Sequence, residues 1–305
     1  MSVKDWLLAL CVVVAWGVNF VVIKVGLQGM PPFLLAGLRF TLVALPTVFF
    51  VPRPRLPLRW LVAYGMTISF GQFAFLFLAI KLGMPAGIAS LVLQAQGFFT
   101  LLLGALLLGE VLRWNHFLGI AIATLGMFVL AEGGMLNQTT TGLTLLTLLL
   151  TLGGALSWAF GNISNKVIMS RHGAGLNVMS LVVWSALVPI GPFFLCSWLF
   201  DGQQAIVASL TSVQMSTVLA LGYLAFVATI MGFGIWSSLL GRYETWRVAP
   251  LTLLVPVFGM LSAALFLDEH MTLLQVAGAL LIMVGLLVNV FGGRLAVLVR
   301  ARSAP

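Results

Sequence analysis

The sequence predicts an all-α integral membrane protein with ten transmembrane helices in two inverted five-helix repeats. Three observations lead to this fold class: an extreme composition, ten apolar runs, and halves that share residues at matching spacings. Of 305 residues, 61% are hydrophobic and only 7% are charged, whereas about a quarter of the residues of a soluble protein are charged. So few charges cannot cover a water-soluble surface. The composition therefore excludes a soluble enzyme, a nucleic-acid-binding protein and a disordered chain.

The spans follow from the length of the apolar runs, because a helix needs about 20 mainly apolar residues to cross a bilayer. Charges, prolines and Gly/Asn/Thr clusters separate the runs, and we expect spans at 5–26, 32–51, 59–81, 85–109, 114–131, 141–166, 176–200, 213–240, 246–267 and 272–293. An eleventh span would require the long run 213–240 to divide. The first run lacks a small-x-small cleavage site and exceeds a signal-peptide core, so we expect it to be retained.

The orientation of the spans follows from the basic residues, which favour cytoplasmic segments. The net charge is +8, and in a ten-span chain most of the basic residues fall on the side of the two termini. These are Lys4, Arg53, Arg55, Arg59, Arg113, Lys166, Arg171, Arg242, Arg247, Arg294, Arg300 and Arg302, opposed by Lys81 and four carboxylates: Glu132, Asp201, Asp268 and Glu269. We therefore expect both termini in the cytoplasm, with 294–305 as a basic tail.

Residues recur at matching spacings in the two halves, which marks an internal repeat. Trp16–Lys24 reads WGVNFVVIK and Trp158–Lys166 reads WAFGNISNK. A second offset aligns Gly109-Glu110 with Asp268-Glu269, Gly119 with Gly278, and Gly126 with Gly285. The four glycines lie seven apart on helix faces, where small residues favour close packing. Because five spans is an odd number, the second repeat must be inverted, and inverted repeats are typical of transporters with a site near the midplane.

Four longer strings carry a family resemblance over about residues 5–293. They are WGVNFVVIKVGL (16–27), PPFLLAGLRF (31–40), GMPAGIASLVLQAQGFFT (83–100) and GRYETWRVAPLTLLVP (241–256). The chain resembles the EamA family of the drug/metabolite transporter superfamily, and within it the bacterial exporters of O-acetylserine and cysteine. The resemblance implies EamA repeats at 1–132 and 141–293, and an exporter of small neutral amino-acid metabolites in the bacterial inner membrane.

Polar and tryptophan side chains within the spans are the candidates for a transport pathway, because such groups are costly in lipid. The candidate substrate-binding residues are Trp16, Asn19, Arg39, Gln72, Gln94, Gln96, Trp158, Asn162, Trp184 and Trp236. The amides have an alternative in hydrogen bonds between helices, and the tryptophans in packing or an interfacial belt. Gln94 and Gln96 are two residues apart on a helix, so we expect only one of them to face a shared cavity.

Arg39 is the sharpest candidate, because it lies eight residues into its span. Three roles are open for it: contact with a substrate carboxylate, snorkelling to the interface or pairing with a helix-end carbonyl, or a structural salt bridge. Lys24, nearer a helix end, favours an interfacial position. Pro250 and Pro256 interrupt the ninth span and are candidate hinges, with a static bend as the alternative.

Acidic and histidine side chains are absent from the middle of the expected spans, and this restricts the possible functions. All seven carboxylates and all three histidines fall at helix ends or in loops, so an intramembrane catalytic base, a metal site and the cavity carboxylate of a cation pump are disfavoured. No nucleotide-binding glycine motif occurs, the two cysteines lie in apolar runs, and we expect no cofactor. The sequence favours a secondary exporter of a zwitterion by alternating access. A broader amino-acid or drug exporter is the alternative, and proton coupling and the choice between monomer and homodimer stay open.

Overall fold

The computed structural model describes residues 1–135, 142–172 and 176–302, and every regular element in this part of the chain is helical. The α-helices are α1 (Val3–Gly29), α2 (Pro32–Thr47), α3 (Leu58–Tyr64), α4 (Gln72–Lys81), α5 (Ala86–Val92), α6 (Gln96–Leu108), α7 (Trp114–Met135), α8 (Leu145–His172), α9 (Val178–Ser185), α10 (Ile190–Cys196), α11 (Gln203–Thr211), α12 (Met215–Gly222), α13 (Gly232–Arg242), α14 (Thr245–Val248), α15 (Val255–Leu267) and α16 (Leu273–Arg302). Short π and 3-10 turns join several of them into longer rods.

Nine helical stretches in the described residues are long and apolar enough to cross a membrane. They correspond to nine of the expected spans, with ends that shift by a few residues. The expected span 32–51 is shorter, because α2 contains Pro46, ends at Thr47 and is followed by a turn. The long run at 213–240 stays continuous from Met215 to Arg242, so the alternative of dividing it is wrong.

Several spans are less regular than expected. The run 176–200 changes direction between α9 and α10, where Pro189 lacks a backbone donor. Pro250 lies in the 3-10 turn η5 (Ala249–Leu254), and Pro256 lies in the first turn of α15. Pro250 therefore lies in a break of the α-helical geometry, and Pro256 lies in the helix turn directly after it. The short helix α11 was not expected from the sequence.

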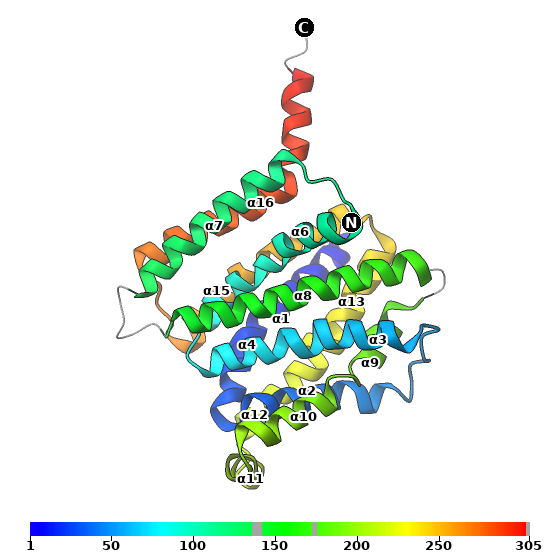
Figure 1. Cartoon of the computed structure of the whole chain (residues 1–305), viewed down its shortest axis with the longest axis vertical. Helices are drawn as coiled ribbons and strands as arrows, with labels where there is room; N and C mark the ends of the chain where they lie inside the picture. The colour runs from blue at the N-terminus through cyan, green and yellow to red at the C-terminus, as the bar shows by residue number, and fades with distance from the viewer. Residues whose placement is uncertain (136–141, 173–175, 303–305) are drawn as a thin grey trace.

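Two long helices, α7 and α16, lie side by side along one edge of the bundle (Figure 1). Their contact is close because glycines meet across it: a Cβ at Gly126 would lie 2.8 Å from the Gly278 carbonyl oxygen, and one at Gly119 would lie 2.7 Å from that of Gly285. The packing role expected for these glycines is confirmed. Each contact joins the first of one glycine pair to the second of the other, as antiparallel helices require.

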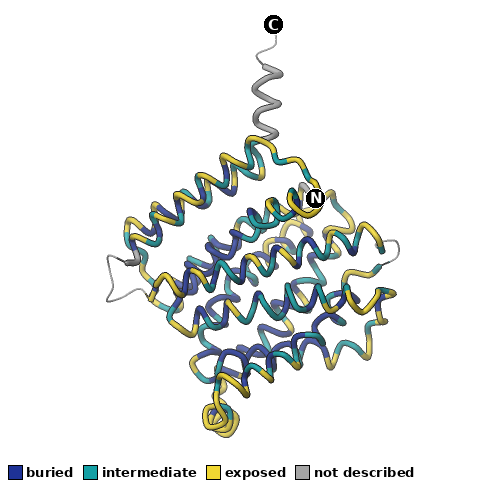
Figure 2. Tube along the Cα trace, viewed as in Figure 1, coloured by how far each residue is buried: buried dark blue, intermediate teal, exposed yellow. Residues whose placement is uncertain are grey.

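The interior of the bundle is formed by α1, α2, α4, α5, α8 and α15, which pack against one another. Figure 2 shows buried residues gathered along these central helices and exposed ones along the outer edges. The exposed outer side chains are mostly large and apolar, such as Leu106, Phe128 and Leu265. An apolar exterior around a core that contains polar side chains is the arrangement that a lipid solvent requires.

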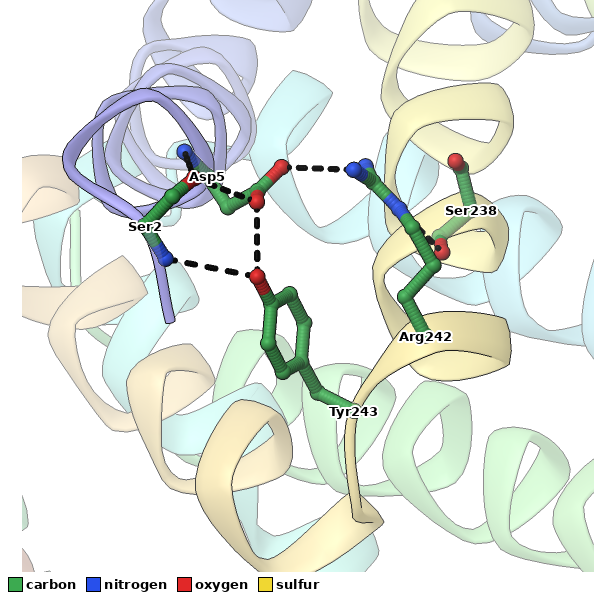
Figure 3. Close-up of polar contacts among 5 residues, drawn as sticks. All are labelled: Ser2, Asp5, Ser238, Arg242 and Tyr243. Atoms are coloured by element: carbon green, nitrogen blue, oxygen red, sulfur yellow. Dashed lines mark hydrogen bonds and ion pairs between the residues drawn. The ribbon is translucent and has the colours of Figure 1, made fainter.

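A polar cluster joins the start of α1 to the end of α13 (Figure 3). The Asp5 carboxylate accepts hydrogen bonds from the hydroxyls of Ser2 (2.6 Å) and Tyr243 (2.7 Å), and forms an ion pair with Arg242 (2.9 Å). Asp5 is 5% exposed, so removal of Arg242 would leave a buried charge without its counter-ion. The cluster marks the end of the bundle where α1 begins and α6 and α8 finish, here called the terminus end. The opposite end, where Glu269 lies, is called the Glu269 end.

Candidate substrate cavity

A cavity of about 190 Å³ lies in the middle of the bundle. Its walls come from both halves of the chain, with contributions from α1, α2, α4, α8 and α9 and from the irregular turns between helices. Seven of the ten expected site residues line it: Trp16, Asn19, Arg39, Gln72, Gln94, Gln96 and Trp158. Residues separated by up to 142 positions in the sequence are thus brought to one site.

Arg39 is the only cation among the residues that line this cavity. Its side chain is almost completely enclosed, with the residue 3% exposed, so snorkelling is wrong. Nη2 donates to the Thr229 hydroxyl at 3.1 Å, while the guanidinium carbon lies 4.1 Å from the Phe73 ring centroid. Nε and Nη1 have no hydrogen-bond partner among the described residues, which also removes the structural salt bridge. A buried guanidinium with two unused donors can bind an anion.

Asn19, which is 8% exposed, supplies a hydrogen-bond acceptor to the same cavity. Its Oδ1 atom is buried and has no hydrogen-bond partner among the described residues. Buried polar atoms are normally paired, so an unpaired acceptor and two unpaired guanidinium donors that line one cavity are consistent with a ligand that pairs with both. Trp16 lies on the same face of α1, and its indole nitrogen donates to the Ala228 carbonyl at 2.9 Å.

Gln94 and Gln96 both line the cavity, so the expectation that only one of them faces it is wrong. The reason is local: α5 gives way to the 3-10 turn η2 (Leu93–Ala95) before α6 begins, and the regular 100° step is lost. Gln94 donates to the Thr252 carbonyl at 3.1 Å, which joins η2 to the break in the ninth span.

Three expected site residues lie outside the lining set. Asn162 donates to Gln96 Oε1 at 2.7 Å and to the Thr100 hydroxyl at 3.1 Å, as its interhelical alternative describes. Trp184 donates to the Val51 carbonyl at 2.9 Å. Trp236 packs on Trp16 with ring centroids 5.2 Å apart. Asn162 and Trp236 therefore contact residues that line the cavity.

Several lining residues were missed in the sequence, above all Thr229 and Ser69. Single hydroxyls in apolar runs are common in membrane helices because they bond their own backbone, and this made them inconspicuous. Thr229 lies in the π turn η4 (Tyr223–Met231), where its hydroxyl donates to the Leu224 carbonyl at 2.8 Å. Ser69 lies in a second π turn, η1 (Gly65–Gly71). Such turns occur frequently at functional sites, and flanking glycines were the only available signal.

Two ion pairs lie at opposite ends of the bundle, one on each side of the cavity. Lys24 Nζ meets Glu269 Oε1 at 2.7 Å at the Glu269 end, and Lys166 pairs with Glu110 at the terminus end. Lys24 is thus paired with a carboxylate, where an interfacial position was expected. Glu269 also accepts the backbone N–H groups of Ala86 (2.9 Å) and Gly87 (3.0 Å).

The chemistry of the cavity is that of binding. Its lining set contains one cation, several amides and hydroxyls, aromatic rings and no carboxylate. Among the described residues, no group of three His, Cys, Asp or Glu side chains has a metal-binding arrangement. The arrangement can hold an ion with a carboxylate against Arg39 and exclude water around it.

Comparison with known proteins agrees with this architecture. Residues 4–131 and 145–291 match the sequence model of the EamA-like transporter family. The chain belongs to this family. It is therefore a multi-pass membrane protein of a transporter family, and the family resemblance predicted from the sequence is confirmed.

Among its relatives, a protein of Escherichia coli (strain K12) and one of Salmonella typhimurium are each 61% identical over 294 residues, covering 96% of this chain and 97% of the relative. Both bear the name "Probable amino-acid metabolite efflux pump". An uncharacterized transporter of Bacillus subtilis, YvbV, is 30% identical, covering 93% of this chain and 90% of its own. A crystal structure superposes with a TM-score of 0.62 at 21% identity, covering 93% of this chain and 95% of that one, so it shares the fold.

Proposed function

We propose that this family member exports small zwitterionic amino-acid metabolites, of the cysteine and O-acetylserine class, across the bacterial inner membrane. The observation that carries the proposal is the buried guanidinium of Arg39, with Nε and Nη1 unpaired at the cavity. A carboxylate entering a low-dielectric cavity costs several kcal/mol unless it is paired and hydrogen-bonded. Arg39 supplies both the charge and a fork of donors.

Two further properties support a small amino acid over a bulky drug. The unpaired Asn19 Oδ1 is an acceptor for the substrate's ammonium group, so Arg39 and Asn19 together complement both ends of a zwitterion. The cavity of about 190 Å³ is smaller than the roughly 300–1,000 Å³ of sites for drug-sized ligands. The names of the Escherichia coli and Salmonella relatives favour the same substrate class.

The proposed mechanism is alternating access of two inverted repeats, 1–132 and 141–293, with ten spans and both termini in the cytoplasm. The crossed glycine contacts between α7 and α16 support a two-fold relation between the repeats. Helix α2, a mainly apolar helix of 16 residues, would be the tenth span. Bends at Pro250 and Pro256 would allow one repeat to rock against the other. Gln72, Gln94, Gln96 and Trp158 would line the path, with Asn162, Trp184 and Trp236 supporting it.

The deciding experiment is transport of labelled cysteine and O-acetylserine by the purified protein in liposomes, with an aromatic amino acid as competitor. We expect saturable transport that the aromatic amino acid inhibits weakly. Equal inhibition would favour the alternative, a broader amino-acid or drug exporter. An imposed pH gradient tests protons as the coupling ion, and light scattering of the purified protein distinguishes monomer from homodimer.

A further inference from the structure

We infer that Glu269 and Glu110 are two equivalent latches, each of which closes one end of the cavity by holding the start of a half-span from the other repeat. This inference rests on the proposed alternating access and adds the residues that switch it. In the structure the Glu269 latch is engaged. In the opposite state Glu110 takes the same role at the terminus end, and Glu269 releases its helix.

The engaged latch is visible in the contacts of Glu269, whose side chain is 14% exposed. One carboxylate, in the second repeat, joins two separate parts of the first repeat. It forms an ion pair with Lys24 at the end of α1, and it accepts the N–H groups of Ala86 and Gly87 where the fourth span begins. Charge-assisted hydrogen bonds of this kind are about twice as strong as neutral ones. Glu269 therefore ties α1 and α5 to the α15–α16 connection.

In the internal repeat, Glu110 and its partner occupy positions equivalent to those of Glu269 and its partner. Lys166 is the counterpart of Lys24, and Glu110 is the counterpart of Glu269. The Lys166–Glu110 ion pair crosses between the repeats in the opposite sense. The offset that aligns the two glutamates also aligns Ala86 and Gly87 with Thr245 and Trp246, the first residues of α14. The repeat therefore provides a second helix start at the position equivalent to the one that Glu269 holds.

The two ends differ in whether a hollow adjoins the central cavity: the hollow that Glu269 lines shares no described residue with the cavity, whereas the one toward the terminus end does. At the Glu269 end, α5 packs directly on α15, and a Cβ at Gly87 would lie 3.2 Å from Ala263 Cβ. Toward the terminus end, a hollow opens between α6, η5 and α16, and it shares Gln94 with the central cavity. A Cβ at Gly97 would meet no atom within 4 Å. The fourth and ninth spans thus meet at the latched end and diverge at the other.

The test measures which face of the membrane reaches the cavity. Ser69, which lines the cavity, is replaced by cysteine in a full-length background with Cys11→Ser and Cys196→Ser. A small, membrane-impermeant, anionic thiol reagent is applied to right-side-out and inside-out vesicles, and the labelling rate from each face is compared. Because labelling needs no substrate, this readout stands whether or not cysteine proves to be the exported molecule. Cysteine transport measured in parallel tests the proposed function separately.

We expect the two single variants to shift the labelling rate in opposite directions. Glu269→Gln raises labelling from the Glu269 face about tenfold, the size expected for loss of charge-assisted hydrogen bonds, whereas Glu110→Gln lowers it. The double variant returns toward the parent rate. Glu132→Gln, the same change at an exposed carboxylate, leaves both rates unchanged. If both latch variants shift labelling in one direction, or neither shifts it at normal abundance, the two-latch inference is overturned.

A charge exchange separates a latch on the helix start from a simple ion pair. The double substitution Lys24→Glu with Glu269→Lys keeps opposite charges but offers no acceptor to the N–H groups of Ala86 and Gly87. We expect labelling from the Glu269 face to stay high in this variant. Lys24→Met, which retains the acceptor, should raise the rate less than Glu269→Gln does, and it serves as the second variant if the exchanged protein fails to fold. Restoration of the parent rate by the exchange would refute the helix latch.

Discussion

Replacing Arg39 by glutamine tests the proposed substrate contact most directly. Nε and Nη1 are both free to bind a carboxylate, while Nη2 stays with Thr229. Hydrogen bonds to charged groups contribute about 1.5–3 kcal/mol each. Because the neutral amide of glutamine retains part of one contact, we expect a loss of about 3 kcal/mol, which is roughly a hundredfold in affinity. Arg39→Lys keeps the charge without the fork and should lose roughly tenfold.

The same substitution should leave the empty protein as stable as before or more stable. Arg39 is 3% exposed and only partly paired, so the native protein carries a desolvation cost of several kcal/mol that a neutral side chain avoids. Function and stability should therefore move in opposite directions. A substitution that only damaged packing would lower both.

The assay combines cysteine transport in liposomes with thermal unfolding of the purified protein, each at a series of cysteine concentrations. A ligand at 100 times its dissociation constant stabilises the folded state by about 2.7 kcal/mol, and this shift should disappear in Arg39→Gln while the unfolding temperature without ligand is retained. An unchanged KM and an unchanged ligand-induced shift at equal abundance would refute the assignment of Arg39 to the substrate carboxylate.

The remaining predictions concern the ammonium contact, the guanidinium's partner, the glycine contact and the topology. Asn19→Ala should raise the KM for cysteine roughly tenfold with normal abundance, since the loss of one hydrogen bond to an ion costs about 1.5 kcal/mol; transport kinetics measure it, and an unaltered KM would assign the amide to packing. Thr229→Val should weaken substrate binding severalfold by freeing the guanidinium to reorient, which the ligand-induced thermal shift detects. Gly126→Ala should cost about 1–3 kcal/mol of stability through overpacking against Gly278, whereas Gly191→Ala, with open space around it, should cost little; equal unfolding temperatures would contradict this. Reporter fusions at Arg171 and at the C-terminus should both register as cytoplasmic, and a periplasmic C-terminus would imply an odd number of spans.

Local composition was enough to predict the membrane class and most of the helices. In a chain with 7% charged residues, each polar side chain inside a span is conspicuous, so Arg39, Asn19 and Gln72 could be selected without coordinates. The paired glycines on α7 and α16 were predictable for a related reason, since their seven-residue spacing already places them on one helix face. These features could be predicted because helical periodicity and the cost of a polar group in lipid both depend on the residues of a single span.

Contacts between residues that are far apart in the sequence decided between the alternative roles that the sequence had left open for the polar side chains. Arg39 meets Thr229 across 190 positions, and Lys24 meets Glu269 across 245; neither pairing is indicated by the local sequence of the two residues. The π turn at Thr229 and the 3-10 turn at Gln94 redirect side chains away from the regular helical step, which the sequence pattern assumed. The sequence by itself determined which groups had to avoid lipid. Only the tertiary structure decided which of them found a protein partner, as Asn162 does with Gln96, and which were left unpaired at the cavity, as Arg39 and Asn19 are. That distinction depends on how helices from the two halves pack.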